Sequence, residues 1–339
     1  MIVSTKIGHR GNYVSMLGQV ASGINNIYCV RVASPVSNIE VKNDKGISLV
    51  ECRIMGKRLG GKRSADDPAY NPLAPGDWVN ISLDSDKSGR GWILDRKART
   101  SAIRRWNRKR HAPQTIAANI DVLMAVGSAS SPPFRPRFLD RLLLCAELGG
   151  AKPVVVINKV DLGISASVNS RLSVYRAMGY HVVVCSAKTG QGLAEFLEIM
   201  EEAELPALVG HSGVGKSALL NRADPNLHRV EGELSRKYDR GSHTTRYGEI
   251  VSVAGKTIAI DTPGIREMEI ADIEPRELRL WYQDFLPFVE NCAFPGCLCV
   301  NEVGCAVRAA TARGDIAQDR YTGYVNILKE LQTAFAQRR

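Results

Sequence analysis

Short apolar runs separated by turn-forming residues make up the first hundred positions of the chain. Between the turns, β-strands are predicted at residues 27–32, 47–54, 78–83 and 91–94. The turns contain NDKG at 43–46, PGD at 75–77 and KSG at 87–89, residue types that favour tight reversals. Several short strands in a small segment are typical of a compact barrel, and we expect the five-stranded OB type.

The pattern changes from residue 116, where continuous apolar runs alternate with helical spacing. Residues 120–126 and 154–157 are apolar throughout, which is typical of buried parallel strands, and residues 138–148 between them carry helical spacing. A helix is also predicted at 193–201, and further strands at 181–185, 207–209, 251–253 and 257–260. We expect an open α/β sheet that binds its ligand at the carboxyl ends of its strands.

After residue 264 the pattern is helical. Helices are predicted at residues 275–282, 306–312 and 320–335, and Pro275 suits the first turn of the first of them. The chain of 339 residues therefore divides into a β-rich part, an α/β part and a helical part.

Charge is distributed unevenly between these parts. The formal net charge is +10, and residues 1–112 hold 20 Lys and Arg against 9 Asp and Glu. A basic segment on an otherwise neutral chain favours a polyanionic partner, most often nucleic acid, over a solvated basic face. No apolar run approaches the roughly 20 residues of a membrane helix, and no signal peptide is evident. We expect a cytoplasmic protein with no membrane partner.

A basic run with one aromatic residue, RRWNRKRH, occupies residues 104–111. It could contact RNA by pairing with phosphates while a base stacks on Trp106. It could equally be a charged linker between domains, and the sequence leaves both interpretations open.

A phosphate loop is predicted at residues 210–217, GHSGVGKS, which fit the pattern G-x-x-x-x-G-K-[ST]. It follows the predicted strand 207–209 and begins a helix, the context that the motif requires. Its backbone N–H groups would surround phosphate oxygens. Lys216 would hold the β- and γ-phosphates, and Ser217 would bind Mg²⁺.

Two further segments are expected to complete the phosphate end of this site. Asp261 ends a predicted strand in the sequence DTPG, where it would hold Mg²⁺ through water while the Gly264 N–H senses the γ-phosphate. In the GSHTT segment at 241–245, Thr244 or Thr245 could close on Mg²⁺. Apolar Ile265 is poorly suited to position water, so His243 is the better candidate, with a surface-loop histidine as the alternative.

A guanine-recognition motif, Asn158-Lys159-Val160-Asp161, ends another predicted strand. The Asp161 carboxylate can accept the N1–H and N2 amino hydrogens of guanine, a pair that adenine lacks. Its usual companion, Ser186-Ala187-Lys188, ends the next strand. Both precede the phosphate loop, although GTPases ordinarily place them after it. Such a rotated order preserves the sheet when the original termini are close together.

Four of the eight cysteines fall within 14 residues, at Cys292, Cys297, Cys299 and Cys305. In a reducing compartment, clustered cysteines favour a metal site over disulfides. The other four are scattered among apolar residues and are interpreted as core.

The rotated order, GHSGVGKS, GSHTT, DTPG and the cysteine cluster together resemble the small ribosomal subunit biogenesis GTPases of the RsgA (YjeQ/EngC) type. The resemblance covers nearly the whole chain. It implies an OB fold, a circularly permuted GTPase domain and a zinc domain. It also implies binding to the 30S subunit and its 16S rRNA in late maturation, with GTP hydrolysis to GDP stimulated by the ribosome.

Carried over position by position, the resemblance assigns the site residues. The expected nucleotide-binding set is Asn158, Lys159, Val160, Asp161, Ser186, Ala187, Lys188, Gly210, His211, Ser212, Gly213, Val214, Gly215, Lys216, Ser217 and Ala218. The expected catalytic set is Lys216, His243, Thr244, Thr245, Asp261 and Gly264, with Ser217 and Thr245 on Mg²⁺.

Two positions depart from the family pattern. Cys299 stands where the family usually has histidine, so the expected single Zn²⁺ would have four thiolate ligands, a set that zinc accepts readily. Arg246 stands where a third threonine is common, which leaves the choice between Thr244 and Thr245 open.

The expected domains are an OB-fold RNA-binding domain at 1–102, a circularly permuted α/β GTPase domain at 103–268 and a helical zinc-binding domain at 269–339, in a monomer. Two alternative functions are a GTP-dependent switch with a protein partner and a non-catalytic RNA-binding module with a structural nucleotide site. The basic barrel and the lack of a lipidation motif disfavour the first, and the Lys216, Ser217 and Asp261 set disfavours the second.

Overall fold

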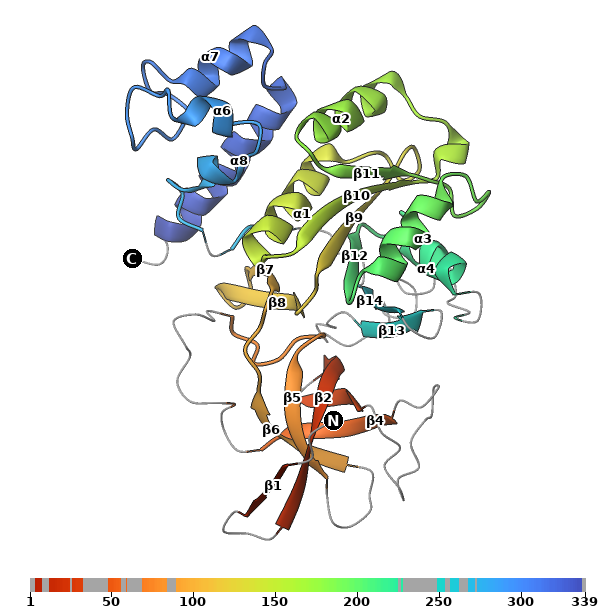
Figure 1. Ribbon diagram of the computed structural model, residues 1–339. Helices are drawn as coiled ribbons and strands as arrows, with labels where there is room; N and C mark the ends of the chain where they lie inside the picture. The colour runs from red at the N-terminus through yellow and green to blue at the C-terminus, as the bar shows by residue number, and fades with distance from the viewer. Residues whose placement is uncertain are drawn as a thin grey trace.

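The computed structural model describes residues 4–7, 12–24, 26–32, 48–55, 59, 69–83, 90–224, 227, 249–253, 257–261, 268–271 and 273–336. Its parts follow the chain in order (Figure 1): a β-barrel carrying the N-terminus, an α/β sheet, and a helical region beside the sheet. No helix within these ranges is long and apolar enough to cross a membrane.

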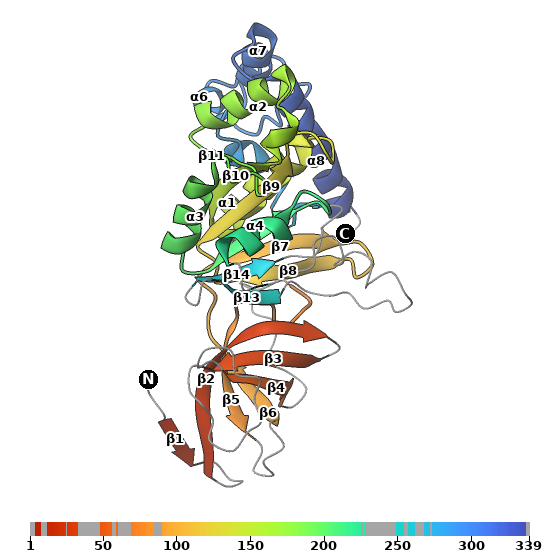
Figure 2. The same cartoon turned by 90° about the vertical axis from the view of Figure 1, so that its right-hand side faces the viewer.

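The barrel has five strands and a sixth that pairs at one side. The strand order is β2-β3-β4-β6-β5, and pairing of β2 with β5 closes the barrel. The bounds are β2 Asn12–Ile24, β3 Ile27–Val32, β4 Ser48–Ile54, β5 Trp78–Leu83 and β6 Arg90–Arg96. Only β4 and β6 run parallel. β1 (Ser4–Ile7) pairs with β2 outside this ring, as Figure 2 shows. The predicted five-stranded barrel is confirmed.

The strand β2 is the barrel element that the hydrophobic pattern did not reveal. Its register against β3 shifts between Val20 and Ser22, a β-bulge that breaks the alternation of apolar and polar positions. Val20 is nonetheless fully buried in the barrel core. Its neighbours there include Val30, Val50, Val79, Ile81 and Ile93.

Part of the basic run at 104–111 is in a β-strand. Residues 104–107 belong to β7 (Ala102–Asn107), which pairs with β8 (Ala112–Ala118) in an antiparallel hairpin. The Trp106 N–H donates to the Glu269 carbonyl at 3.0 Å. The hairpin lies between the barrel and the α/β sheet in Figure 1, and it contacts the start of the C-terminal region.

The α/β sheet has the strand order β11-β10-β9-β12-β14-β13. Its first five strands run parallel and β13 is an antiparallel edge strand. Their bounds are β9 Val122–Ser128, β10 Lys152–Asn158, β11 His181–Val184, β12 Pro206–Gly210, β13 Glu249–Val253 and β14 Thr257–Asp261. Every residue of β9 and β12 is buried, as their uninterrupted apolar runs predict.

Helices cover both faces of this sheet. α1 (Pro136–Gly149) and α2 (Ala166–Ala177) pack on one face, and α3 (Leu193–Glu202) and α4 (Lys216–Ala223) pack on the other. α2 had no clear sequence signal because polar and small residues interrupt its apolar positions. A short 3₁₀ turn, η1 (Val160–Leu162), follows β10.

The C-terminal region contains η3 (Leu278–Trp281), α6 (Leu286–Val289), α7 (Ala306–Arg313) and α8 (Gln318–Ala336). The prediction of an α-helix at 275–282 was wrong, because these residues form turns and the 3₁₀ helix η3. α8 lies beside α1, and its residues Tyr324, Ile327, Leu328 and Leu331 belong to the same core as α1. The helical region is thus packed onto the α/β sheet.

Candidate guanine-nucleotide site and cysteine cluster

The phosphate loop turns sharply between β12 and α4 because two of its glycines adopt positive φ, +81° at Gly213 and +97° at Gly215. A Cβ atom on Gly215 would lie 2.2 Å from the Asn158 Nδ2 atom. Side chains other than hydrogen are therefore excluded both by backbone conformation and by space. Glycine at this position allows the loop to close against the segment that follows β10.

Lys216 begins α4 and is buried, with 8% of its surface exposed. Its ammonium donates to the Gly210 carbonyl at 2.9 Å and to the His211 carbonyl at 3.3 Å. The side chain therefore reaches back across the loop. Its positive charge therefore lies within the phosphate loop at the start of α4, a place that favours a bound phosphate.

Asn158 connects three segments that are far apart in the sequence. It is almost completely buried, its Nδ2 donates to the Val214 carbonyl at 3.0 Å, and its Oδ1 accepts from the Ala187 N–H at 3.0 Å. The carboxyl ends of β10 and β11 are thereby fixed to the phosphate loop. Asn158 therefore braces the loop that follows β10.

Lys159 adds a second connection to the phosphate loop. Its backbone has a φ of +66°, and its ammonium donates to the Gly213 carbonyl at 2.6 Å and to the Ser131 carbonyl at 2.7 Å. The stem of the side chain consequently crosses from the end of β10 to the loop.

Asp161 is oriented by a serine of the companion motif. The Ser186 hydroxyl donates to Asp161 Oδ1 at 2.6 Å and accepts the Thr189 N–H at 3.1 Å. Val160, the third residue of the 158–161 motif, is buried, and its N–H donates to the Cys185 carbonyl at 3.3 Å. The 158–161 and 186–188 motifs, expected at the ends of two successive strands, are brought together.

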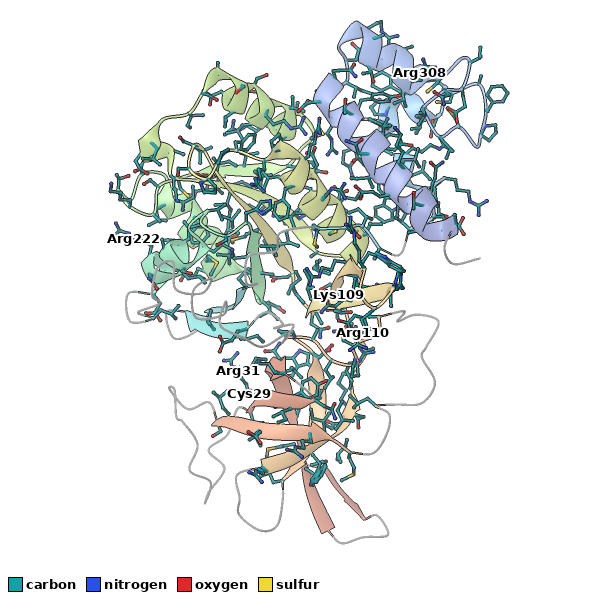
Figure 3. All side chains as sticks on the ribbon, turned by 180° about the vertical axis from the view of Figure 1, so that it is seen from behind. Cys29, Arg31, Lys109, Arg110, Arg222 and Arg308 are labelled. Atoms are coloured by element: carbon teal, nitrogen blue, oxygen red, sulfur yellow. The ribbon has the colours of Figure 1, made fainter. Side chains whose placement is uncertain are left out.

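Arg222 is a residue of this site that sequence reasoning missed. It lies on α4, and its guanidinium donates to the Ala187 carbonyl at 2.6 Å and to the Lys188 carbonyl at 2.8 Å. Figure 3 shows it beside the green strands and helices of the sheet. Arg222 belongs to no sequence motif. Its partners are backbone carbonyls of a loop 34 and 35 residues earlier in the chain.

The remaining predicted site residues can be placed only in part. Asp261 ends β14, and its Cα lies opposite Leu208 of β12, two residues before the phosphate loop begins. His243, Thr244, Thr245 and Gly264 lie outside the described residues. Their expected roles stay predictions.

His211, in the phosphate loop, contacts the start of α1. Its ring centroid lies 3.9 Å from that of Phe138, and its Nε2 lies 3.4 Å from the Arg135 guanidinium. Burial, Arg135 and Lys216 together lower the pKa of His211. The imidazole is therefore biased toward its neutral form.

The four clustered cysteines form a compact set of sulfur atoms. The Sγ atoms of Cys292, Cys297, Cys299 and Cys305 all lie within 4.8 Å of one another, and those of Cys297 and Cys299 are 3.9 Å apart. Four thiolates at about 2.3 Å from one Zn²⁺ in a tetrahedron are separated by roughly 3.8 Å. The donor set therefore fits a closed structural zinc site.

Local hydrogen bonds support the cysteine turn. Cys299, with a φ of +59°, donates its N–H to the Cys297 sulfur at 3.3 Å. Burial and the adjacent thiol of Cys305 raise the pKa of Cys297 to about 11, so a nearby cation would be needed to favour thiolates. Glu302, which sequence reasoning missed, accepts N–H groups from Leu298 and Val300. These bonds outweigh its burial and lower its pKa to about 2.

The phosphate loop adjoins the guanine-recognition motif and its companion at one end of a parallel sheet. Because these motifs occur in rotated chain order, the arrangement defines a circularly permuted GTPase. The model of the family described as RsgA GTPase matches residues 96–271. The chain belongs to this family, and it is a GTP hydrolase.

Relatives and solved structures agree with this assignment. The chain is 36% identical over 314 residues to the "Small ribosomal subunit biogenesis GTPase RsgA" of Borrelia recurrentis, covering 93% of this chain and 94% of that protein. It is similar to the crystal structure of YjeQ from Thermotoga maritima, with a TM-score of 0.65, 26% identity, and coverage of 94% and 99%. It is also similar to YloQ, a circularly permuted GTPase, with a TM-score of 0.62, 26% identity, and coverage of 96% and 98%.

Proposed function

We propose that this protein binds the 30S ribosomal subunit through its 16S rRNA and hydrolyses GTP to GDP and phosphate in late maturation of that subunit. The observation that carries the nucleotide half of the proposal is the pair of bonds from Asn158 to Val214 and Ala187, which join the two guanine-side motifs to the phosphate loop. The ribosomal half rests on the named function of relatives matched over nearly the whole chain.

The proposed nucleotide contacts follow from this frame. Asp161, oriented by Ser186, accepts hydrogens of guanine, and the Lys159 stem lies along the base. The 210–218 loop holds the phosphates, with Lys216 moving from its carbonyl partners to phosphate oxygens. Ser217, together with Thr244 or Thr245, holds Mg²⁺, Asp261 holds it through water, and His243 positions the attacking water.

The other proposed features concern the domains and metal. Residues 1–102 form the RNA-binding domain, 103–268 the GTPase domain, and 269–339 a domain with one Zn²⁺ on the four cysteines. We infer a cytoplasmic monomer. Because α8 of the domain that holds the cysteines packs on α1 of the GTPase domain, the metal would stabilise a domain attached to the GTPase domain.

Turnover measurements with purified 30S subunits test this function. We expect slow intrinsic phosphate release from GTP, strong stimulation by 30S subunits, and loss of both with Lys216→Ala. Arg176→Ala, which changes an exposed residue of α2, is the matched control. If 30S subunits at near-physiological salt neither bind the GTP-analogue form nor raise turnover, the ribosomal role is wrong.

The two alternatives give different results in the same system. A switch with a protein partner predicts that captured complexes survive RNase treatment. A non-catalytic RNA-binding module predicts no phosphate release that depends on Lys216.

A further inference from the structure

An open pocket of about 510 Å³ lies beside the phosphate loop, and His211 is the loop residue that lines it. Its walls come from the tip of the β7–β8 hairpin, the start of α1, the phosphate-loop residue His211 and the α8 residue Glu330. Four arginines line it, namely Arg108, Arg135, Arg137 and Arg141. No nucleotide contact proposed above uses these arginines.

Two of the four arginines are neutralised by carboxylates. Arg141 makes a bidentate ion pair with Glu330, 2.7 Å for each bond, and also donates to the Met268 carbonyl. Arg108 pairs with Glu269, the other acidic residue of the lining. These pairs hold the walls in place and contribute no net charge.

The other two arginines leave the pocket positive. Arg135 and Arg137 are exposed at the start of α1. Within the described part of the chain neither has an ion pair, and the side-chain contact of Arg135 is the one with His211. The first turn of a 14-residue helix adds a partial positive charge at the same place. A planar guanidinium pair at a helix start is suited to bidentate recognition of a phosphate.

The positive surface continues beyond the pocket. Lys109 and Arg110, at the turn of the same hairpin, are exposed and lie between the sheet and the barrel in Figure 3. The Arg110 guanidinium lies 6.0 Å from the centre of the Tyr70 ring. An extended polyanion could therefore contact the hairpin turn and the pocket together, which a small anion could not.

We propose that this pocket receives a backbone phosphate of RNA on Arg135 and Arg137, and that its occupancy changes the phosphate loop through the contact between Arg135 and His211. The inference rests on the proposed RNA partner and assigns it a site. A bound phosphate accepts the guanidinium donors of Arg135 and draws them from the His211 ring. His211 then loses a positive neighbour and a hydrogen-bond partner, and it belongs to the loop that holds the nucleotide.

Binding of a fluorescent single-stranded RNA across a salt series tests the site. For Arg135→Gln/Arg137→Gln, we expect about tenfold weaker binding near 0.1 M salt and a salt slope smaller by roughly 0.7 to 1, because the contact with one phosphate is lost. Arg135→Lys/Arg137→Lys should lie between this variant and wild type. Arg176→Gln, at an exposed position of α2, should match wild type in affinity and slope.

The coupling has its own readout, the release rate of a fluorescent GDP analogue with and without RNA. RNA should change this rate in wild type and in Arg176→Gln, and should leave it unchanged in Arg135→Gln. Equal RNA affinity and salt slope for the double glutamine variant and wild type would overturn the site. The site would also be overturned if binding of inorganic phosphate depended on these arginines while RNA binding did not.

Failure of this inference can be told apart from failure of the proposed function. If 30S subunits bind and stimulate both wild type and the double glutamine variant equally, only the pocket assignment is wrong. If 30S subunits leave wild type unbound and unstimulated, the proposed function itself is wrong.

Discussion

The Asn158 side chain donates a hydrogen bond to the Val214 carbonyl at 3.0 Å, which attaches the end of β10 directly to the phosphate loop. The two residues are separated by 56 positions, and in this rotated chain the guanine-side residue comes first. The contact shows how permutation can leave a nucleotide site intact, because the site depends on which strand ends adjoin and not on their order along the chain.

Removing this connection should weaken nucleotide binding. Asn158→Ala leaves the Ala187 N–H and the Val214 carbonyl without their buried partner, at a cost of about 1–3 kcal/mol for each unsatisfied group. We expect roughly 10- to 100-fold weaker binding of a fluorescent GDP analogue. Asn169→Ala, at an exposed position of α2, is the control, and equal affinity of both variants would contradict the structural role of Asn158.

Gly215 tests the same contact from the other side. Gly215→Ala places a Cβ 2.2 Å from Asn158 Nδ2 at a φ of +97°, so the loop must shift. We expect a loss of nucleotide affinity at least as large as that of Asn158→Ala. Gly179→Ala, also at positive φ but in open space, controls for backbone strain alone and should leave nucleotide affinity unchanged.

Base selectivity should depend on Asp161. Asp161→Asn replaces a pure acceptor by a group that also donates, which opposes the guanine N1–H and N2 hydrogens and suits the xanthine carbonyl. We expect GTP to lose its advantage over ATP and xanthosine nucleotides to gain affinity in a competition assay. Ser186→Ala, which removes the 2.6 Å bond that orients Asp161 and the bond from the Thr189 N–H but keeps the Asp161 carboxylate, should weaken GTP binding without changing base preference.

The cysteine cluster predicts one zinc per chain. Elemental analysis after metal depletion and zinc reloading should find one Zn²⁺ in wild type and in Cys299→His, because histidine is a zinc ligand and tolerates positive φ. Cys299→Ser should lower zinc retention during dialysis against a chelator. Cys145→Ser is the control from a buried cysteine outside the cluster, and equal retention in all four proteins would contradict the metal site.

The nucleotide motifs could be predicted because each consists of consecutive residues whose backbone requirement is local, such as the glycines of the 210–217 loop. The contacts between motifs could not. Arg222 contacts a loop 34 and 35 residues earlier, and its partner atoms are backbone carbonyls that carry no sequence signature.

The hydrophobic pattern failed where geometry or packing interrupts it. The bulge in β2 shifts the alternation within the strand, and residues 275–282 have a helical pattern but pack as turns and the 3₁₀ helix η3 against the end of α1 and α8. The basic run at 104–111 left two interpretations open because charged residues carry no hydrophobic periodicity, and half of it is β7.

The packing of the C-terminal region on the GTPase domain should depend on one buried carboxylate, Asp140 of α1. Its oxygens accept from Arg171 at 2.5 Å and from Tyr175 at 2.9 Å, and lie 3.1 Å from Arg320 of α8. Burial opposes the charge of Arg320, but Asp140 and Asp284 outweigh it and raise its pKa. Asp140→Ala leaves two buried guanidinium groups short of a partner, so we expect a loss of about 3–5 kcal/mol in the free energy of unfolding by urea.

Asp319→Ala is the matched control for Asp140→Ala, because Asp319 pairs with the same arginine at 2.8 Å but its side chain is 52% exposed. Its loss should cost about 1 kcal/mol or less. If Asp140→Ala instead unfolds the C-terminal region at a lower urea concentration than the sheet, the network holds that region to the GTPase domain. A single transition at the wild-type midpoint would show that Asp140 has no such role.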